Sequence, residues 1–345
     1  MYIFNKTKID VNMFDKSNCS ECQDIDCLTR CQWMDIDKKT AREEMQKMIN
    51  GEDSFVLKDC VTCFACDEYC PYDSHPFDLK TELQEKYNSH NIDPTMVEMA
   101  IKQFSPHDEV RIKDIDPDKP VFHKCTFSKI NPEEMKGQMF ENMQYISGTD
   151  FFCNLLFHHL ARDSVIKERI PKIIENIQKH GIKEIVCWHD ECYGLWTSYC
   201  KRNNIEVPFK PIHLFEYVYG YLKDHEPEIK KLNMKIAYQR SCSNRFLPEI
   251  EKYVDDICEL IGVERVERMY DRENALCCTA PFATLGKNDL VKPTHDKNIK
   301  DMIDNGAEAC VFVCPMCKRT MGSKVEGNGL KSFLLSDLAR MALGE

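Results

Sequence analysis

Hydrophobic and polar positions repeat one pattern in the C-terminal two thirds of the chain. Apolar residues at helical spacing run over 170–180, the stretch ends at Gly181, and the apolar run Ile185–Trp188 follows. The same order returns at 297–305, Gly306 and 309–313. Short apolar runs alternating with helical stretches predict parallel β-α units. We therefore expect two pseudo-symmetric α/β halves, at 120–224 and 235–345, joined by a charged linker at 225–234.

The first hundred residues show a different pattern, in which short helical stretches separate groups of cysteines. Helical spacing of apolar residues over 39–50 ends at Gly51, and a second helix is expected over 77–87. Residues 105–119 are charged, contain two prolines and lack apolar periodicity, so they are interpreted as a linker. The sequence thus predicts a separate helical domain over 1–104.

Composition narrows the classes of function. The 345 residues carry a formal net charge of −11, which disfavours nucleic acid or an anionic membrane surface as partner. No run approaches the ~20 apolar residues of a membrane span, and Met1–Lys8 has no apolar signal core. We therefore expect a cytoplasmic protein without a transmembrane segment. In that compartment twenty cysteines indicate metal or cluster binding rather than disulfides.

Eight of the cysteines lie in the N-terminal domain, in two groups. The second group, Cys60–Pro71, matches the bacterial ferredoxin run C-x2-C-x2-C-x3-C-P, whose fourth cysteine binds the other cluster of a pair. The first group, Cys19–Cys31, has two extra residues between its second and third cysteines and lacks the proline. A zinc knuckle is the alternative. With ligand exchange between the groups, we expect two [4Fe-4S] cubanes, one on Cys19, Cys22, Cys27 and Cys70 and one on Cys60, Cys63, Cys66 and Cys31.

Five more cysteines come from three segments near the C-terminus: Cys242, the adjacent pair Cys277-Cys278, and the pair Cys314 and Cys317. Thiolates select zinc, copper(I) or iron–sulfur clusters. A structural zinc takes four ligands, whereas an adjacent cysteine pair suits a cluster of several irons. Zinc, or an ordinary cubane on four of the five, is the alternative. Arg240, Lys318 and Arg319 flank the set and are expected either to offset its negative charge or to be solvated.

The first half carries a degenerate copy of this set. Adding 125 to Cys153, His189 and Cys192 gives Cys278, Cys314 and Cys317, while Phe152 stands at the position of Cys277. Cys125 ends the first predicted strand of this half. The candidate metal ligands are therefore Cys125, Cys153, His189 and Cys192. Three cysteines and a histidine suit zinc and can also bind a cubane, and a purely structural vestige is the third possibility.

The spacing of the C-terminal cysteines resembles the cysteine-rich CCG module of the B-type polypeptide of heterodisulfide reductase, with Thr279 at the position of the glycine. The N-terminal layout resembles the C-type polypeptide of the same family, so nearly the whole chain is similar to the fused, D-type form that joins the two. The resemblance implies a di-cluster ferredoxin-like helical domain followed by two α/β CCG repeats. It also implies a non-cubane [4Fe-4S] cluster as the catalytic site, bound by Cys242, Cys277, Cys278, Cys314 and Cys317.

The resemblance further implies thiol/disulfide chemistry fed by electrons from the two cubanes. In the family, cleavage of CoM-S-S-CoB is attributed to a pair of non-cubane clusters, and this chain has the cysteines for one. An electron-transfer subunit of another enzyme, or a zinc-and-cluster scaffold in a larger complex, are the alternatives. No G-x-G-x-x-G follows a predicted strand, so a redox protein or flavin subunit is expected to donate the electrons within a hetero-complex.

Overall fold

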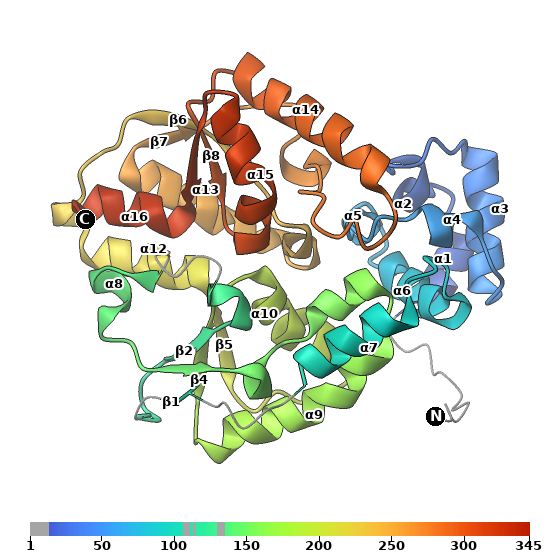
Figure 1. Cartoon of the computed structure of the whole chain (residues 1–345), viewed down its shortest axis with the longest axis horizontal. Coiled ribbons are helices and arrows are strands. Elements are labelled where there is room, and N and C mark those ends of the chain that lie inside the picture. Colours follow the sequence, from blue (N-terminus) through green and yellow to red (C-terminus); the bar gives the residue numbers. More distant parts are fainter. Residues whose placement is uncertain (1–13, 106–110, 113–114, 130–134) are drawn as a thin grey trace.

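The computed structural model describes residues 14–105, 111–112, 115–129 and 135–345. Figure 1 shows a helical N-terminal region at one end of the molecule and two sheets with their helices beside it. The prediction on Met1–Lys8 and part of the predicted linker at 105–119 fall outside the described residues. No helix in the described ranges combines the length and apolar character needed to cross a bilayer.

The N-terminal region is built from short helices around a core of its own. The predicted helices over 39–50 and 77–87 are confirmed, and Gly51, with φ +74°, ends the first of them in the left-handed conformation that suits glycine. Leu28, Met45 and Phe77 are buried in the core. The helices are α1 (Lys16–Glu21), α2 (Asp26–Thr29), α3 (Lys38–Ile49), α4 (Phe55–Asp59), α5 (Ala65–Glu68), α6 (Pro76–Tyr87) and α7 (Pro94–Gln103).

The first sheet has the strand order β1-β3-β2-β4-β5, with β1 antiparallel to β3 and the other pairs parallel. Its strands are β1 (Arg111–Ile112), β2 (Val121–Lys124), β3 (Tyr145–Ser147), β4 (Glu184–Cys187) and β5 (Lys210–His213). Strand β1 lies in the segment interpreted as a linker, so part of that segment joins the sheet. The helices are α8 (Gln138–Glu141), α9 (Asp163–Lys179), α10 (Asp190–Gly194), α11 (Cys200–Arg202) and α12 (Leu214–Asp224).

The second sheet has the order β7-β6-β8-β9 and is parallel throughout. Its strands are β6 (Met234–Gln239), β7 (Val263–Arg265), β8 (Ala309–Phe312) and β9 (Lys331–Leu334), and its helices are α13 (Glu251–Ile261), α14 (Asn288–Asp304), α15 (Pro315–Gly327) and α16 (Leu335–Leu343). The order matches β3-β2-β4-β5 of the first sheet, strand for strand. The prediction of two α/β halves is therefore confirmed.

Two of the predicted helices begin earlier than the sequence pattern indicated. Helix α9 extends the predicted 170–180 stretch back to Asp163, and α14 extends the 297–305 stretch back to Asn288. Each contains a proline, Pro171 or Pro293, in its interior. In α9, buried residues at helical spacing on both sides of the proline bind the helix to the sheet, which offsets the lost backbone hydrogen bond.

The two halves share one core rather than packing as separate domains. Helix α12 of the first half lies against α13 and α16 of the second (Figure 1). Val186 and Phe215 of the first half belong to the same buried cluster as Tyr238, Ile257 and Leu338 of the second. The ligand-bearing ends of the two sheets are therefore held in a fixed relation to each other.

Candidate metal centres

The first N-terminal cysteine set surrounds one small cavity. Cys19, Cys22, Cys27 and Cys70 all line it, so the structure brings together three cysteines of the first sequence group and the last of the second. Burial and the neighbouring thiols together raise the pKa of Cys19 and of Cys27 to about 12, although Lys80 lowers that of Cys27. Such thiols keep their protons at neutral pH unless a metal displaces them. The set therefore fits a positively charged cluster core.

The second N-terminal set combines Cys31 with Cys60, Cys63 and Cys66. Burial raises the pKa of Cys31 to about 11, with further contributions from Cys63 and Cys60. Burial also raises the pKa of Cys60, and it raises the pKa of Cys66 well above its usual range. The thiol of Cys63 contributes to the raised pKa of Cys60, and that of Cys60 contributes to the raised pKa of Cys66. Cys31 of the first sequence group thus lies near Cys60 and Cys63 of the second group.

Both cysteine loops hold backbone N–H groups against sulfur. In the first loop Ile25, with φ +58°, donates its N–H to Cys22 Sγ at 3.4 Å. In the second, Thr62, with φ +56°, donates to Cys60 Sγ at 3.4 Å. A residue other than glycine in this conformation costs about 1–2 kcal/mol, so such positions mark functional loops. Here the strained turns aim N–H dipoles at sulfurs that carry negative charge once they bind metal.

Lys80 on α6 is a buried cation that the sequence analysis did not identify. Its side chain is enclosed among thiols, hydrogen bonds to Cys66 and interacts with Cys60 and Cys27. Burial lowers the pKa of Lys80, but the thiols raise it well above its usual value. Because Cys27 and Cys66 belong to different sets, the ammonium places positive charge between them. Most residues of α6 are buried, polar ones included, so Lys80 has no access to solvent, and no sequence motif marks it.

The second repeat brings its five cysteines to the carboxyl ends of β6 and β8. Cys242 opens the 3-10 turn η7 (Cys242–Phe246), Cys314 is the N-cap of α15, and Cys317 lies in the first turn of that helix. Hydrogen bonds from Cys277 and Cys317 hold the pKa of Cys278 well below its usual value. A hydrogen bond from Cys317, together with His189, lowers the pKa of Cys314 to about 6. Within this hydrogen-bonded group, Cys278 and Cys314 are therefore the thiols that lose their protons most readily.

Thr279 shows why a glycine suits the position after the cysteine pair. Its φ is +68°, and Asn154, which lies 125 residues earlier, has φ +63°. The cost visible here is the left-handed backbone, which glycine adopts freely. Thr279 offsets that cost in part, because its N–H donates to Cys277 Sγ at 3.3 Å and its hydroxyl bonds His295 Nε2 at 2.9 Å.

The first repeat brings Cys125, Cys153 and Cys192 together. Cys192 hydrogen bonds to both of the others, and this contact lowers the pKa of Cys125 to about 7. The set is not a strict copy of the other. Phe122 pairs with Val186 as Tyr238 pairs with Val311, so Cys125 aligns with Ser241 and not with Cys242.

His189 lies between the two repeat sets. It is the N-cap of α10, as Cys314 is of α15, and its Nδ1 accepts the N–H of Glu191 at 3.1 Å. Its side chain hydrogen bonds to Cys314 of the other repeat. Burial lowers the pKa of His189, but that contact raises it well above its usual value. The sequence analysis placed His189 with Cys125, Cys153 and Cys192, and the structure adds direct contact with the second-repeat set.

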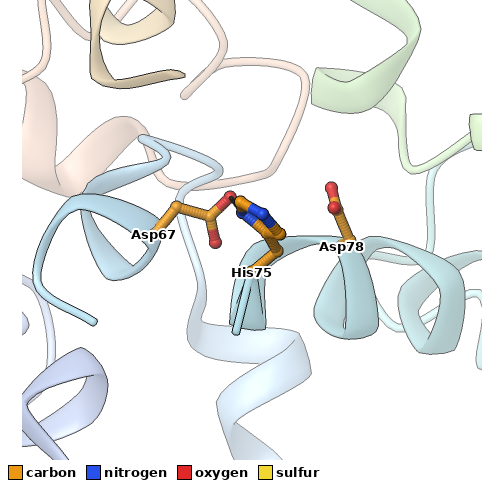
Figure 2. A group of neighbouring side chains, drawn as sticks. All are labelled: Asp67, His75 and Asp78. Atoms are coloured by element: carbon orange, nitrogen blue, oxygen red, sulfur yellow. Dashed lines mark ion pairs between the residues drawn. The ribbon is translucent and has the colours of Figure 1, made fainter. Parts of the chain in front are cut away.

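In the part of the chain that the structure describes, no cysteine set has three ligand atoms that all lie within 4.8 Å of one another. A tetrahedral zinc with Zn–S bonds of about 2.3 Å separates its sulfurs by roughly 3.8 Å. Among the described residues, Asp67, His75 and Asp78 form the one group of histidine, cysteine or carboxylate ligand atoms that all lie within 4.8 Å of one another (Figure 2).

The Asp67–His75–Asp78 group joins the N-terminal region to the first repeat. Arg202 of α11 lies 3.7 Å from Asp67 and 3.3 Å from Asp78, and its Nη1 lies 3.3 Å from His75 Nδ1. The guanidinium thus supplies the cation that a metal would otherwise provide. Burial raises the pKa of Asp78 to about 6, although Arg202 lowers it, because the same cation is shared with Asp67.

The junction with the second repeat has the opposite arrangement. Glu68 of α5 binds two buried arginines, Arg240 at 2.7 Å and Arg245 at 2.6 Å. Arg240 also pairs with Glu251 at 2.9 Å. Lys318 pairs with Asp337 at 3.4 Å, and Arg319 is exposed. Arg240 and Lys318 are thus paired with carboxylates rather than standing as free counter-charges to the cysteines.

The four cysteine sets follow one another across the molecule. Cys63 of the second N-terminal set packs in one apolar cluster with Val61, Phe282 and Cys277 of the second repeat. The charge of a Cys63 thiolate also contributes to the raised pKa of Cys242, after burial and closer groups. Lys80 connects the two N-terminal sets, and His189 connects the two repeat sets. The geometry therefore places the two N-terminal sets, the second-repeat set and the first-repeat set in series.

This geometry agrees with a family match in the second repeat. Residues 236–322 match the family model of CCG, a cysteine-rich domain. The CCG segment contains all five cysteines of the second-repeat set. Together, the CCG domain and twenty cysteines indicate an iron–sulfur electron-transfer protein. No curated protein sequence matches the chain.

Solved structures add information on the fold alone. A hypothetical protein from Helicobacter pylori superposes with a TM-score of 0.57 at 14% identity, covering 89% of this chain and 65% of that one. The CCG-containing chain thus spans less than two thirds of that protein's length. Glutamate racemases from Bacillus anthracis (isoform RacE1) and Campylobacter jejuni subsp. jejuni reach TM-scores of 0.35 and 0.36 at 10% and 11% identity. They cover 65% and 64% of this chain and 79% and 82% of their own, and this likeness is too weak to carry an argument.

Proposed function

We propose that the chain is an iron–sulfur oxidoreductase subunit in which two [4Fe-4S] cubanes pass electrons to a non-cubane [4Fe-4S] cluster in the CCG domain. The observation that carries the proposal is the packing of Cys63, in the second N-terminal set, into one apolar cluster with Cys277. When bound, the clusters supply one-electron transfer. The chemistry at the CCG domain is thiol/disulfide conversion of the heterodisulfide reductase kind.

The order of the cysteine sets gives the direction of electron transfer. Half-buried cysteines occur in both N-terminal sets, Cys22 and Cys70 in the first and Cys31 and Cys63 in the second. The second set packs against the CCG domain through Cys63, whereas the first set, which lines a small cavity, lies on the other side of Lys80. An electron-donating redox protein or flavin subunit therefore docks nearest to Cys22 and Cys70, and the CCG domain receives the electrons.

The two repeat sets face each other, as two-centre disulfide chemistry requires. His189 hydrogen bonds to Cys314, and the pKa values of Cys278 and Cys314 lie below the usual value of a thiol because of hydrogen bonds from their neighbours. The first-repeat set, however, has Phe152 where the second has Cys277. Electron transfer to another enzyme, without disulfide reduction by the chain itself, is therefore the second candidate. We expect slow or absent reduction of CoM-S-S-CoB by the isolated chain, and turnover at a rate typical of the family would contradict this.

Metal analysis of the purified full chain tests the proposal. Anaerobic quantification of iron, sulfide and zinc, combined with EPR, should give about twelve irons, eight from two cubanes and four from the CCG domain. Zinc in both repeats, with no paramagnetic signal beyond that of the N-terminal clusters, would support the zinc-and-cluster scaffold instead.

A further inference from the structure

His159 lies where three parts of the molecule meet. It belongs to the 3-10 helix η4 (Leu155–Leu160) of the first repeat. Its Nδ1 lies 2.8 Å from Thr62 Oγ1 in the second N-terminal loop, and its Nε2 lies 3.7 Å from Cys242 Sγ of the CCG domain. Its ring also packs on Phe64, with 5.1 Å between centroids. The sequence analysis gave this residue no role.

The hydrogen bonds of Thr62 identify which ring nitrogen carries the proton. The Thr62 hydroxyl has a single hydrogen and donates it to Val61 O at 2.7 Å. Its oxygen must then accept from His159, so Nδ1 is the protonated nitrogen. A neutral imidazole carries one N–H, which leaves a lone pair on Nε2. That lone pair faces the sulfur of Cys242.

A proton or a metal must lie between this lone pair and the Cys242 sulfur, and without metal the Cys242 S–H donates to Nε2. Both atoms are acceptors once Cys242 is deprotonated, so their approach is unfavourable without a metal or an added proton. The observed separation matches two ligands of one metal. A tetrahedral ion with bonds of about 2.3 Å to sulfur and about 2.0 Å to nitrogen separates these atoms by roughly 3.6 Å.

We propose that His159 is a further ligand of the CCG-domain cluster, in which its Nε2 binds the iron that Cys242 binds. The inference rests on the proposed function in one respect, namely that the second-repeat set holds iron. A neutral nitrogen ligand raises the reduction potential of a cluster relative to a thiolate, as in Rieske centres. Because Thr62 fixes the ring, the loop of the second cubane also positions a ligand of its electron acceptor.

The test is pulsed EPR of the full chain labelled with ¹⁵N-histidine, in the paramagnetic state of the CCG-domain cluster. We expect the strong coupling of a directly bonded imidazole nitrogen. The coupling should disappear in His159→Gln and persist in His225→Gln, a matched control at the end of α12, far from the cysteine sets. His159→Gln should also lower the reduction potential of this cluster.

The possible results separate this inference from the proposed function. A CCG-domain cluster that shows only the weak coupling of a hydrogen-bonded nitrogen overturns the ligand assignment and leaves the electron-transfer proposal standing. Absence of iron from the second-repeat set overturns both. If His159→Gln fails to fold, His189→Gln provides the second variant. Loss of the strong coupling in His189→Gln would assign the nitrogen to His189 and reject His159.

Discussion

The two repeats have the same backbone plan but different ligand sets. Their parallel strands follow the same order, Asn154 and Thr279 share a left-handed conformation, and His189 and Cys314 both cap the helix that follows the central strand. The second repeat has five cysteines where the first has three and a histidine. At the positions that correspond in the two repeats, the fold is the same and the residue type differs, whereas Cys125 aligns with Ser241 and not with Cys242.

Phe152 of the first repeat and Cys277 of the second occupy matching positions, and they show how the repeats diverge. Phe152 packs against Phe104 and Phe127, with ring centroids 4.8 and 5.8 Å away, and so belongs to the core. Cys277, at the matching position, packs with Cys63 beside the second N-terminal loop. In the first repeat this residue covers the C-terminal end of α7, and in the second repeat it lies beside the second N-terminal cysteine set.

The largest effect should come from removing one matched cysteine in each repeat. Cys278→Ser should abolish the CCG-domain cluster and any thiol-induced paramagnetic species, because Cys278 contacts Cys277 and Cys317. Cys153→Ser, its counterpart, should leave that cluster intact. Iron content and EPR of the two variants provide the measurement. Equal loss of iron in both would show that the repeats bind metal alike.

The core role of Phe152 predicts a large effect on stability. Phe152→Cys should lower the free energy of unfolding by about 3 kcal/mol, because the ring leaves a cavity against Phe104 and Phe127. Unfolding under argon, followed by tryptophan fluorescence, measures the change. Cys200→Ala, a smaller truncation in the same core, is the control. A change below about 1 kcal/mol for Phe152→Cys would mean that the first repeat tolerates the five-cysteine pattern.

The paired left-handed residues should respond differently to glycine. Thr279→Gly loses the bond to His295 but gains relief of about 1–2 kcal/mol from backbone strain, so stability should stay close to wild type. Asn154→Gly gains little, because asparagine tolerates this conformation, and loses the 2.8 Å bond from Arg169 at a cost of about 1 kcal/mol. Thermal unfolding of the two variants checks this order. The reverse order would contradict the strain argument.

The smallest effect should be a pH dependence confined to the first-repeat junction. The pKa of Asp78, raised by burial to about 6, exceeds its usual value of 3.8, so the folded state retains a proton that the unfolded chain releases. The free energy of unfolding should therefore fall as pH rises from about 4 through 6, and level off above. Asp78→Asn should flatten this fall between about pH 4 and 6, whereas the non-titrating surface change Thr95→Ala should not. An unchanged slope in Asp78→Asn would refute the assignment.

The sequence predicted the features that are local or periodic. The two α/β halves followed from apolar runs between helical stretches, and α3 and α6 from helical spacing. The sequence analysis did not predict how far α9 and α14 extend toward the N-terminus. A proline usually ends a helix, and in these two helices burial overrides that tendency. Part of the segment at 105–119 forms β1, whose two residues are too few to show a period.

The site was less predictable because it depends on contacts between distant segments. The positions of the cysteines in sequence suggested the sets, but not their order across the molecule. Lys80, His159 and Glu68 carry no motif, and their roles come from contacts with residues far away in sequence or on other elements of the N-terminal region. His189 illustrates the limit, since its register with Cys314 was visible in the sequence and its contact with Cys314 was not.

The central claim is that electrons reach the CCG domain through the second N-terminal set. The most direct measurement is freeze-quench EPR of the full chain after mixing with a protein electron donor, with Cys66→Ser as the comparison. The account predicts that in wild type the N-terminal clusters are reduced first and the CCG-domain cluster follows. In Cys66→Ser, the CCG-domain cluster should stay oxidised on that timescale. Reduction of the CCG-domain cluster at the same rate in both proteins would contradict it.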